Sequence, residues 1–121
     1  MDKQKFSYFL NERRALLVVS WVGELEANDS EAIEKCSQEV KKSPCKYVIV
    51  NLQGVTGYDP VLAGPIVKFQ DAIRNKPSFL VLTELSKDLR EKLATKGLIR
   101  EGDIMNTIKD ALQLVLTMGL G

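Results

Sequence analysis

Two short, uninterrupted runs of apolar residues constrain the fold more than any other feature of the sequence. They are 46-KYVIVNL-52 and 78-SFLVLT-83. Strict alternation of polar and apolar residues would indicate a strand with one face in water, whereas continuous runs are typical of strands covered on both faces. A longer run, 15-ALLVVSWVGEL-25, predicts a further strand, with Gly23 at a bulge or at its end. The chain therefore needs helices on both sides of a sheet.

Helical patterns separate these predicted strands. Segment 28–43 places its apolar residues on one face, and Asn28 with Glu31 three positions later fits a capping box. A second helix is expected to end at about residue 76. A third is expected over 87–96, with Ser86 as its N-cap and Gly97 in the left-handed conformation just after its last residue. The last helix is expected near the C-terminus, with Asn106 or Thr107 as its N-cap.

The N-terminal part predicts a hairpin. Phe6, Tyr8 and Leu10 alternate with polar residues, as in a half-buried edge strand, and 11–14 reads as a polar turn. The whole order, two strands and then helices alternating with strands, predicts an α/β fold. Its sheet is mixed and mostly parallel, with four to five strands, an N-terminal hairpin and about four helices. At 121 residues we expect a single domain over 1–121, with its core at about 5–118.

Composition excludes several classes of function. The chain carries 17 basic and 16 acidic residues in mixed groups, which argues against nucleic-acid binding, and it has no histidine. We expect no enzyme, metal or cofactor, because imidazole dyads are absent and the two cysteines are too few for a metal site. Cys36 is expected in the core, whereas Cys45 is expected to be the more exposed thiol. Without a signal-peptide pattern or a membrane-spanning run, a reduced, cytoplasmic protein without membrane insertion is expected.

The stretch 55-VTGYDPVLAGPI-66 stands where a strand should give way to a helix. Asp59 followed by Pro60 is typical of a helix start, because the carboxylate caps free N–H groups and proline at the first position loses no hydrogen bond. Pro65 leaves two alternatives: a helix from Pro60 that is kinked or loosened at Pro65, or, as we favour, regular helix only from Pro65. The corners beyond the carboxyl ends of parallel strands are where ligands and partners meet such folds.

This corner is either a structural connection alone or an exposed ridge that docks a protein partner. An apolar patch with a tyrosine anchor favours the second interpretation. The predicted partner-binding residues are Tyr58, Asp59, Pro60, Val61, Leu62 and Gly64.

The chain resembles the STAS domain, a family that includes bacterial anti-sigma-factor antagonists and modules of anion transporters. The similar parts are the order of elements, 46-KYVIVNLQGVTGYD-59 and 93-LATKGLIRE-101. The resemblance implies that a serine after the aspartate is phosphorylated by a kinase-type anti-sigma factor, which the phosphate then releases. Here Pro60 and Val61 take the serine positions and Leu62 the glycine position. Valine has no oxygen to phosphorylate, so we expect the docking surface without the switch, and Thr56, expected to be half-buried, is a secondary candidate for the acceptor.

The sequence leaves three functions open. The first is a stress-signalling module that binds a kinase-type anti-sigma factor or a signalling scaffold. The second is a cytosolic subunit of a lipid or anion transporter, and the third a domain that binds a nucleotide or small anion at a helix N-terminus. The free edge of the hairpin also allows two copies of the chain to pair as a homodimer.

Overall fold

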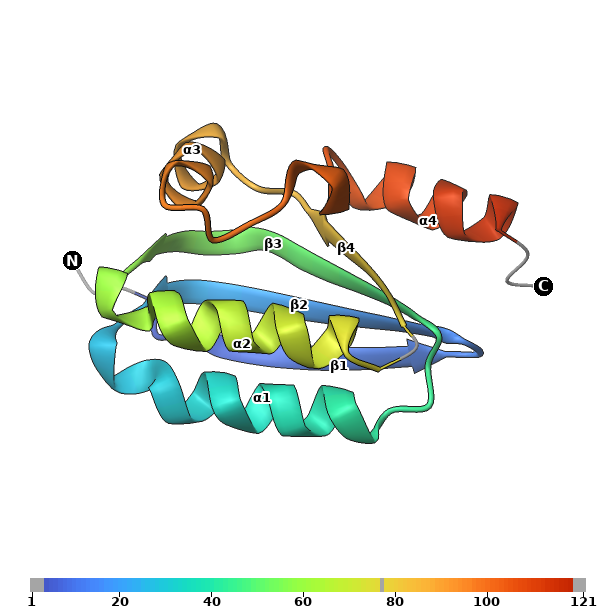
Figure 1. Ribbon diagram of the computed structural model, residues 1–121, viewed down its shortest axis with the longest axis horizontal. Helices are drawn as coiled ribbons and strands as arrows, with labels where there is room; N and C mark the ends of the chain where they lie inside the picture. Colours follow the sequence, from blue (N-terminus) through green and yellow to red (C-terminus); the bar gives the residue numbers. More distant parts are fainter. Residues whose placement is uncertain (1–3, 77, 119–121) are drawn as a thin grey trace.

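The computed structural model describes residues 4–76 and 78–118 as an α/β fold with helices on both faces of one sheet (Figure 1). The strands are β1 (Ser7–Arg13), β2 (Leu16–Leu25), β3 (Tyr47–Tyr58), β4 (Phe79–Thr83) and β5 (Ile104–Met105). The helices are α1 (Ser30–Lys42), α2 (Ala63–Arg74), α3 (Lys87–Thr95) and α4 (Ile108–Thr117). The predicted fold class, with its opening hairpin, five-stranded mixed sheet and four helices, is confirmed.

The sheet has the order β1-β2-β3-β4-β5, the same as the order along the chain. β1 pairs with β2 in antiparallel fashion, and every later pair is parallel. Because parallel neighbours need a crossover, α1, α2 and α3 each connect two successive strands. The carboxyl ends of β2 and β3 meet at Leu25 and Tyr58, which are paired in register.

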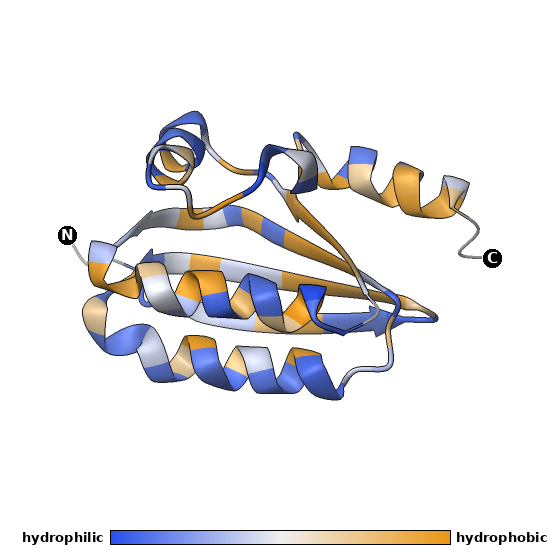
Figure 2. Ribbon diagram, viewed as in Figure 1, coloured by the Kyte–Doolittle hydropathy of each residue, from blue (hydrophilic) through white to orange (hydrophobic). Residues whose placement is uncertain are grey.

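The two faces of the sheet are covered unequally. α1 and α2 lie side by side over one face, while α4 lies over the other (Figure 1). The larger core joins the sheet to α1, α2 and α3, and the smaller one joins Leu16, Tyr47, Ile49 and Val81 to the buried face of α4. Hydrophobic segments accordingly alternate with hydrophilic ones along β3, and they cover much of α4 (Figure 2).

Several predicted helix ends and one bulge are confirmed. Ser86 accepts a hydrogen bond from the N–H of Leu89, and Thr107 does the same for Asp110. Gly97 has a φ of +71°, and the N–H of Leu98 donates back to the carbonyl of Leu93. The pairing of β2 with β3 slips by one residue between Gly23 and Glu24, which places a bulge beside Gly23 with its extra residue on β3, and it slips once more between Ser20 and Val22.

Two local predictions near the N-terminus are wrong. Residues 11–13 belong to β1, and the turn is confined to Arg14 and Ala15 because Arg14 adopts a left-handed φ of 53°. The predicted capping box does not form on Asn28. A 3₁₀ turn precedes α1 instead, and the Asp29 carboxylate accepts from the N–H of Glu26 at 2.7 Å.

The expected exposure of Cys45 is also wrong, whereas Cys36 is buried as predicted. Cys45 is only 2% exposed, and its thiol donates to the carbonyl of Arg14 in the hairpin turn at 3.7 Å. Burial raises the pKa of Cys45. A buried thiol of raised pKa reacts slowly, so Cys45 is not a readily oxidised cysteine.

Candidate functional site

The corner between β3 and α2 is held by three hydrogen bonds that backbone N–H groups donate, two to backbone carbonyls and one to a side chain. β3 continues to Tyr58, further than the apolar run alone indicated. The N–H of Asp59 then donates to the carbonyl of Leu25 at 2.8 Å, which ties the corner to the end of β2. The Asp59 carboxylate accepts from the N–H of Val61 at 2.9 Å, and the N–H of Leu62 donates to the carbonyl of Asp59. The predicted Asp59–Pro60 start is confirmed.

The position of Pro65 follows neither predicted alternative. Pro60–Leu62 form a single 3₁₀ turn, and regular helix begins at Ala63. Pro65 is therefore the third residue of α2, inside the first turn, where a backbone N–H has no acceptor within the helix. The proline costs no helical hydrogen bond there, so it requires neither a kink nor a later start.

Replacing Asp59 by alanine tests this cap. We expect the free energy of unfolding to fall by about 1 kcal/mol, because the N–H of Val61 loses its acceptor. Asp59→Asn is the matched control, since asparagine caps nearly as well. Urea denaturation of both variants measures the difference, and equal losses would show that the charge, rather than the cap, is the stabilising element.

The residues of the predicted ridge range from exposed to buried. Val61 is 64% exposed, Pro60 and Gly64 are exposed, and Tyr58 and Asp59 are half-buried. Leu62, by contrast, is 1% exposed and belongs to the larger core, so its inclusion in the exposed ridge was wrong. We call Tyr58, Asp59, Pro60, Val61 and Gly64 the docking corner. Leu62 supports this corner from below.

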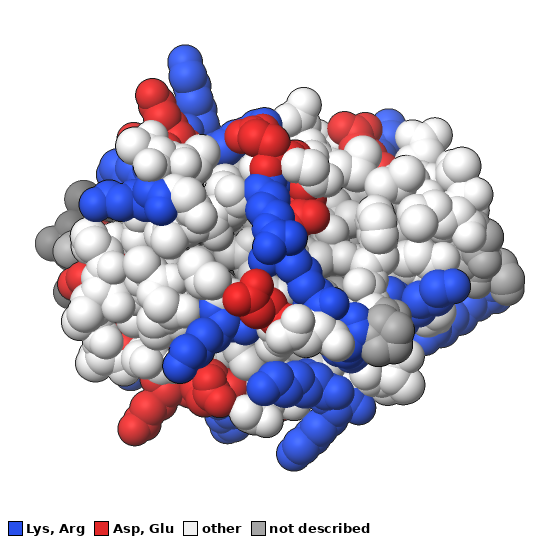
Figure 3. Space-filling view, viewed as in Figure 1, with Lys and Arg blue, Asp and Glu red and all other residues white. Residues whose placement is uncertain are grey.

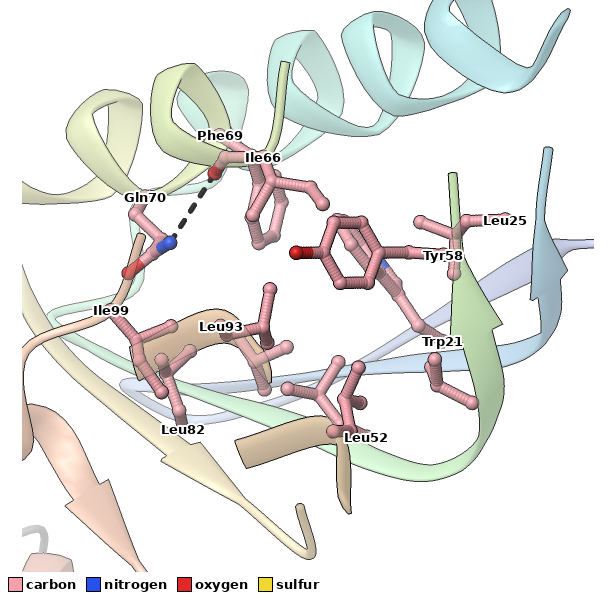
Figure 4. A pocket seen from close by; sticks show the side chains of 13 residues that line it. Trp21, Leu25, Leu52, Tyr58, Ile66, Phe69, Gln70, Leu82, Leu93 and Ile99 are labelled. Carbon is pink, nitrogen blue, oxygen red and sulfur yellow. Dashed lines mark hydrogen bonds between the residues drawn. The ribbon is translucent and has the colours of Figure 1, made fainter. Parts of the chain in front are cut away.

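The Tyr58 ring links the docking corner to the interior. It packs against the larger core, and its hydroxyl is directed into an apolar cavity of about 40 Å³ beneath α2 and α3 (Figure 4). At the rim of this cavity the Gln70 side-chain amide donates to the backbone carbonyls of Ile66 and Leu98. A cavity of this size has room for only a few waters. It is therefore a packing feature rather than a site for a nucleotide or another cofactor.

The docking corner is flanked by charged side chains of two kinds. On one side Glu24 and Glu26 line a shallow acidic hollow together with Asp59. On the other side an open groove separates the corner from α3 and is lined by Tyr58, Pro60, Asp88, Glu91, Lys92, Thr95 and Lys96. Charges of both signs are also interspersed over the α1–α2 side (Figure 3). The corner thus combines an apolar tip at Val61 with polar flanks.

The hydroxyl-bearing residue Thr56 near the tip is more exposed than predicted. Thr56, predicted to be half-buried, is exposed on β3. It lies in the strand, before the capped turn, and so is not at the N-terminus of α2.

The described part of the chain has neither a metal-binding cluster nor a membrane-spanning helix. Within residues 4–76 and 78–118, no cluster of acidic or cysteine side chains is arranged to hold a metal ion. None of the helices in these ranges has the length and apolar character needed to cross a membrane.

The sequence of residues 10–111 matches the family model of the STAS domain. The chain belongs to the STAS domain family. STAS domains are generally modules without catalytic activity. A comparison with curated protein sequences gave no match.

Several solved structures share the fold at low sequence identity. The cell-fate determinant SpoIIAA of Bacillus, in its phosphorylated form, is 19% identical with a TM-score of 0.68, over 90% of this chain and 99% of that one. An anti-sigma factor antagonist from Mycobacterium paratuberculosis is 18% identical with a TM-score of 0.76, over 92% and 94%. The STAS domain of a SulP transporter from Vibrio cholerae is 16% identical with a TM-score of 0.70, over 89% and 86%.

Proposed function

We propose that this STAS domain is a protein-interaction module of the anti-sigma-factor-antagonist kind, whose docking corner binds its partner without control by phosphorylation at Val61. The observation that carries the proposal is the geometry of the corner. A rigid, carboxylate-capped turn holds Val61 in solvent at 64% exposure. A large aliphatic side chain fixed in water at the tip of a turn suits burial in a partner's socket.

The missing hydroxyl decides how binding would be regulated. A phosphate on the first turn of a helix adds negative charge and can reorganise or repel a partner. Residues 59–64 are Asp, Pro, Val, Leu, Ala and Gly, so the turn carries no side-chain hydroxyl that could accept a phosphoryl group. Phosphorylation of a hydroxyl at this turn therefore cannot release the partner. Thr56, exposed on β3, is the secondary candidate for a modified residue.

The flanks of the corner indicate the chemistry of the partner. The hollow beside Asp59 is lined by Glu24 and Glu26, and acidic residues at the rim of an interface favour basic side chains opposite. We expect an apolar socket for Val61 next to a lysine or arginine. A kinase-type anti-sigma factor or a scaffold of a signalling complex would be the protein that carries this surface.

Charge introduced at the tip tests the proposal. The wild-type chain serves as bait in an extract of the source cell, beside the variant Val61→Glu and a control variant, Leu116→Glu. The Kd of each bait for the recovered protein is then measured. Leu116 is as exposed as Val61, at 65%, but lies on α4. We expect Val61→Glu to weaken binding at least tenfold, about 1.4 kcal/mol, and Leu116→Glu to leave it unchanged.

The outcomes of this experiment separate the candidate functions. Binding that survives Val61→Glu would overturn the docking corner. A recovered permease or transport ATPase would point to the transporter subunit, and a kinase-type protein to the signalling module. Mass spectrometry of the chain from its native cell completes the test: phosphate on Thr56 would show that a switch exists after all, at a new position.

A further inference from the structure

We propose that a second copy of this chain pairs with the outer edge of β1, in antiparallel register about Leu10, and that the two sheets become continuous. β1 is the first strand of the sheet order, and of the described strands only β2 pairs with it. The opposite edge of β1 therefore presents unpaired backbone donors and acceptors. This self-association is separate from the docking corner.

The edge of β1 has few of the features with which natural sheets block such pairing. Soluble proteins protect an edge with proline, a bulge, charged side chains (lysine above all) or a very short strand. β1 has seven residues, SYFLNER, with neither proline nor lysine, and its two charged residues, Glu12 and Arg13, stand together at its C-terminal end. Its pairing with β2 runs without a bulge from Ser7 opposite Val22 to Arg13 opposite Leu16. A long, regular and open edge of this kind is expected to be covered in the working protein.

Apolar side chains stand on both faces of this strand. Phe9, opposite Ser20, is 60% exposed on the face away from α1. Leu10, opposite the core residue Val19, is 36% exposed at the rim of the α1 side. A shallow hollow lined by Tyr8, Phe9, Leu10 and Glu39 lies along the same edge. An added strand would thus bury apolar surface on each face as well as satisfy the backbone.

The pattern of β1 favours a second copy as the occupant. Leu10 is the midpoint of Ser7–Arg13, so antiparallel pairing about Leu10 uses every residue of the strand in both copies. The opposed pairs are Leu10 with Leu10, Phe9 with Asn11, Tyr8 with Glu12, and Ser7 with Arg13. No like charges face each other directly. Centring the pairing on Glu12 instead would place two carboxylates opposite one another, which is destabilising.

One strand pair buries less surface than a standard protein interface of about 1,200–2,000 Å², so we expect a weak dimer with Kd on the order of 10–100 µM. Sedimentation velocity between about 5 µM and 1 mM measures it. We expect wild type to shift from monomer to dimer over this range. A chain that stays monomeric up to 1 mM would overturn the proposal, because a different strand would then have to cover the edge.

The register gives the decisive variants, since residue 10 faces itself. Leu10→Lys and Leu10→Glu alone each place two like charges at the centre, and we expect at least a tenfold rise in Kd. An equimolar mixture of the two should restore dimers, since lysine then faces glutamate. Circular dichroism checks that each variant is folded. Dimers unaffected by either variant, or a mixture that fails to restore them, would overturn the register.

A cross-link supplies a second measurement. In this register the two Cα atoms of residue 10 lie about 4.5–5.5 Å apart, a separation that a disulfide spans. Cys36 and Cys45 are buried and do not compete. We expect Leu10→Cys to form a covalent dimer under mild oxidation and Leu116→Cys to stay monomeric, although Leu116 is more exposed. The reverse result would assign self-association to α4.

Discussion

Replacing Phe69 by alanine should lower the free energy of unfolding by about 3–5 kcal/mol. Phe69 is 2% exposed on α2, and its ring centroid lies 4.7 Å from that of Trp21 on β2. Truncation removes this aromatic contact and leaves a void that adjoins the existing cavity of about 40 Å³, so the surroundings cannot readily collapse onto it. Urea denaturation followed by circular dichroism measures the loss.

Phe79→Ala is the matched control for this change. The same ring is removed, but Phe79 is 39% exposed on β4 and touches Tyr47 at the border of the smaller core. We expect a loss of about 1 kcal/mol, in proportion to the smaller area that the ring buries. Trp21 is the only tryptophan, so its fluorescence should change in Phe69→Ala and stay constant in Phe79→Ala. Similar losses in both variants would contradict the packing argument.

The importance of Phe69 extends to the docking corner. The capped turn leads directly into α2, and Leu62 of the turn lies in the larger core together with Ile66 and Phe69 of α2. The exposed tip at Val61 therefore rests on residues that are fixed by packing. A rigid surface loses little conformational freedom when it binds, which favours affinity. Weakening the core under α2 should consequently loosen the corner before the sheet itself unfolds.

The sequence predicted those features that depend on neighbouring residues. The buried runs of β3 and β4, and the caps at Asp59, Ser86 and Thr107, follow from local hydrophobic patterns and from single hydrogen bonds, and the structure confirms them. Caps of this type join residues two or three positions apart, so the local sequence is enough to predict them.

The errors concern features set by contacts that are distant in sequence. Cys45 was expected to be exposed because it follows Pro44, yet the hairpin turn at Arg14 covers it. Leu62 was placed on the exposed ridge because it was expected to form an apolar patch with Tyr58 and Val61, yet its side chain packs into the larger core. The partner-binding role of the docking corner stays a prediction, since burial and geometry describe a surface without naming its partner.

A second large effect is expected at alkaline pH and arises from Cys36. This thiol is fully buried on α1, and loss of solvation raises its pKa to about 12 from an ordinary value of 9.0. The Trp21 indole lowers the pKa and Glu39 raises it, both by less than burial does. Between pH 9 and 12 the unfolded chain loses this proton while the folded chain keeps it. The contribution of this thiol to the free energy of unfolding is thus fully present below pH 9. It is lost as the pH rises from 9 to 12, by up to about 4 kcal/mol in total.

Comparison with Cys36→Ala isolates this contribution from the other groups that titrate in the same range. At pH 8 the variant should be less stable than wild type by about 1 kcal/mol, because a buried sulfur is lost. That difference should shrink above pH 9 and reverse by pH 11, since alanine has no proton to lose. Tyr8→Phe separates the parallel effect of Tyr8, whose pKa is also raised by desolvation and by Glu39. Urea denaturation under reducing conditions at each pH is the measurement, and a constant difference between wild type and Cys36→Ala from pH 8 to 11 would show that the folded state admits the thiolate.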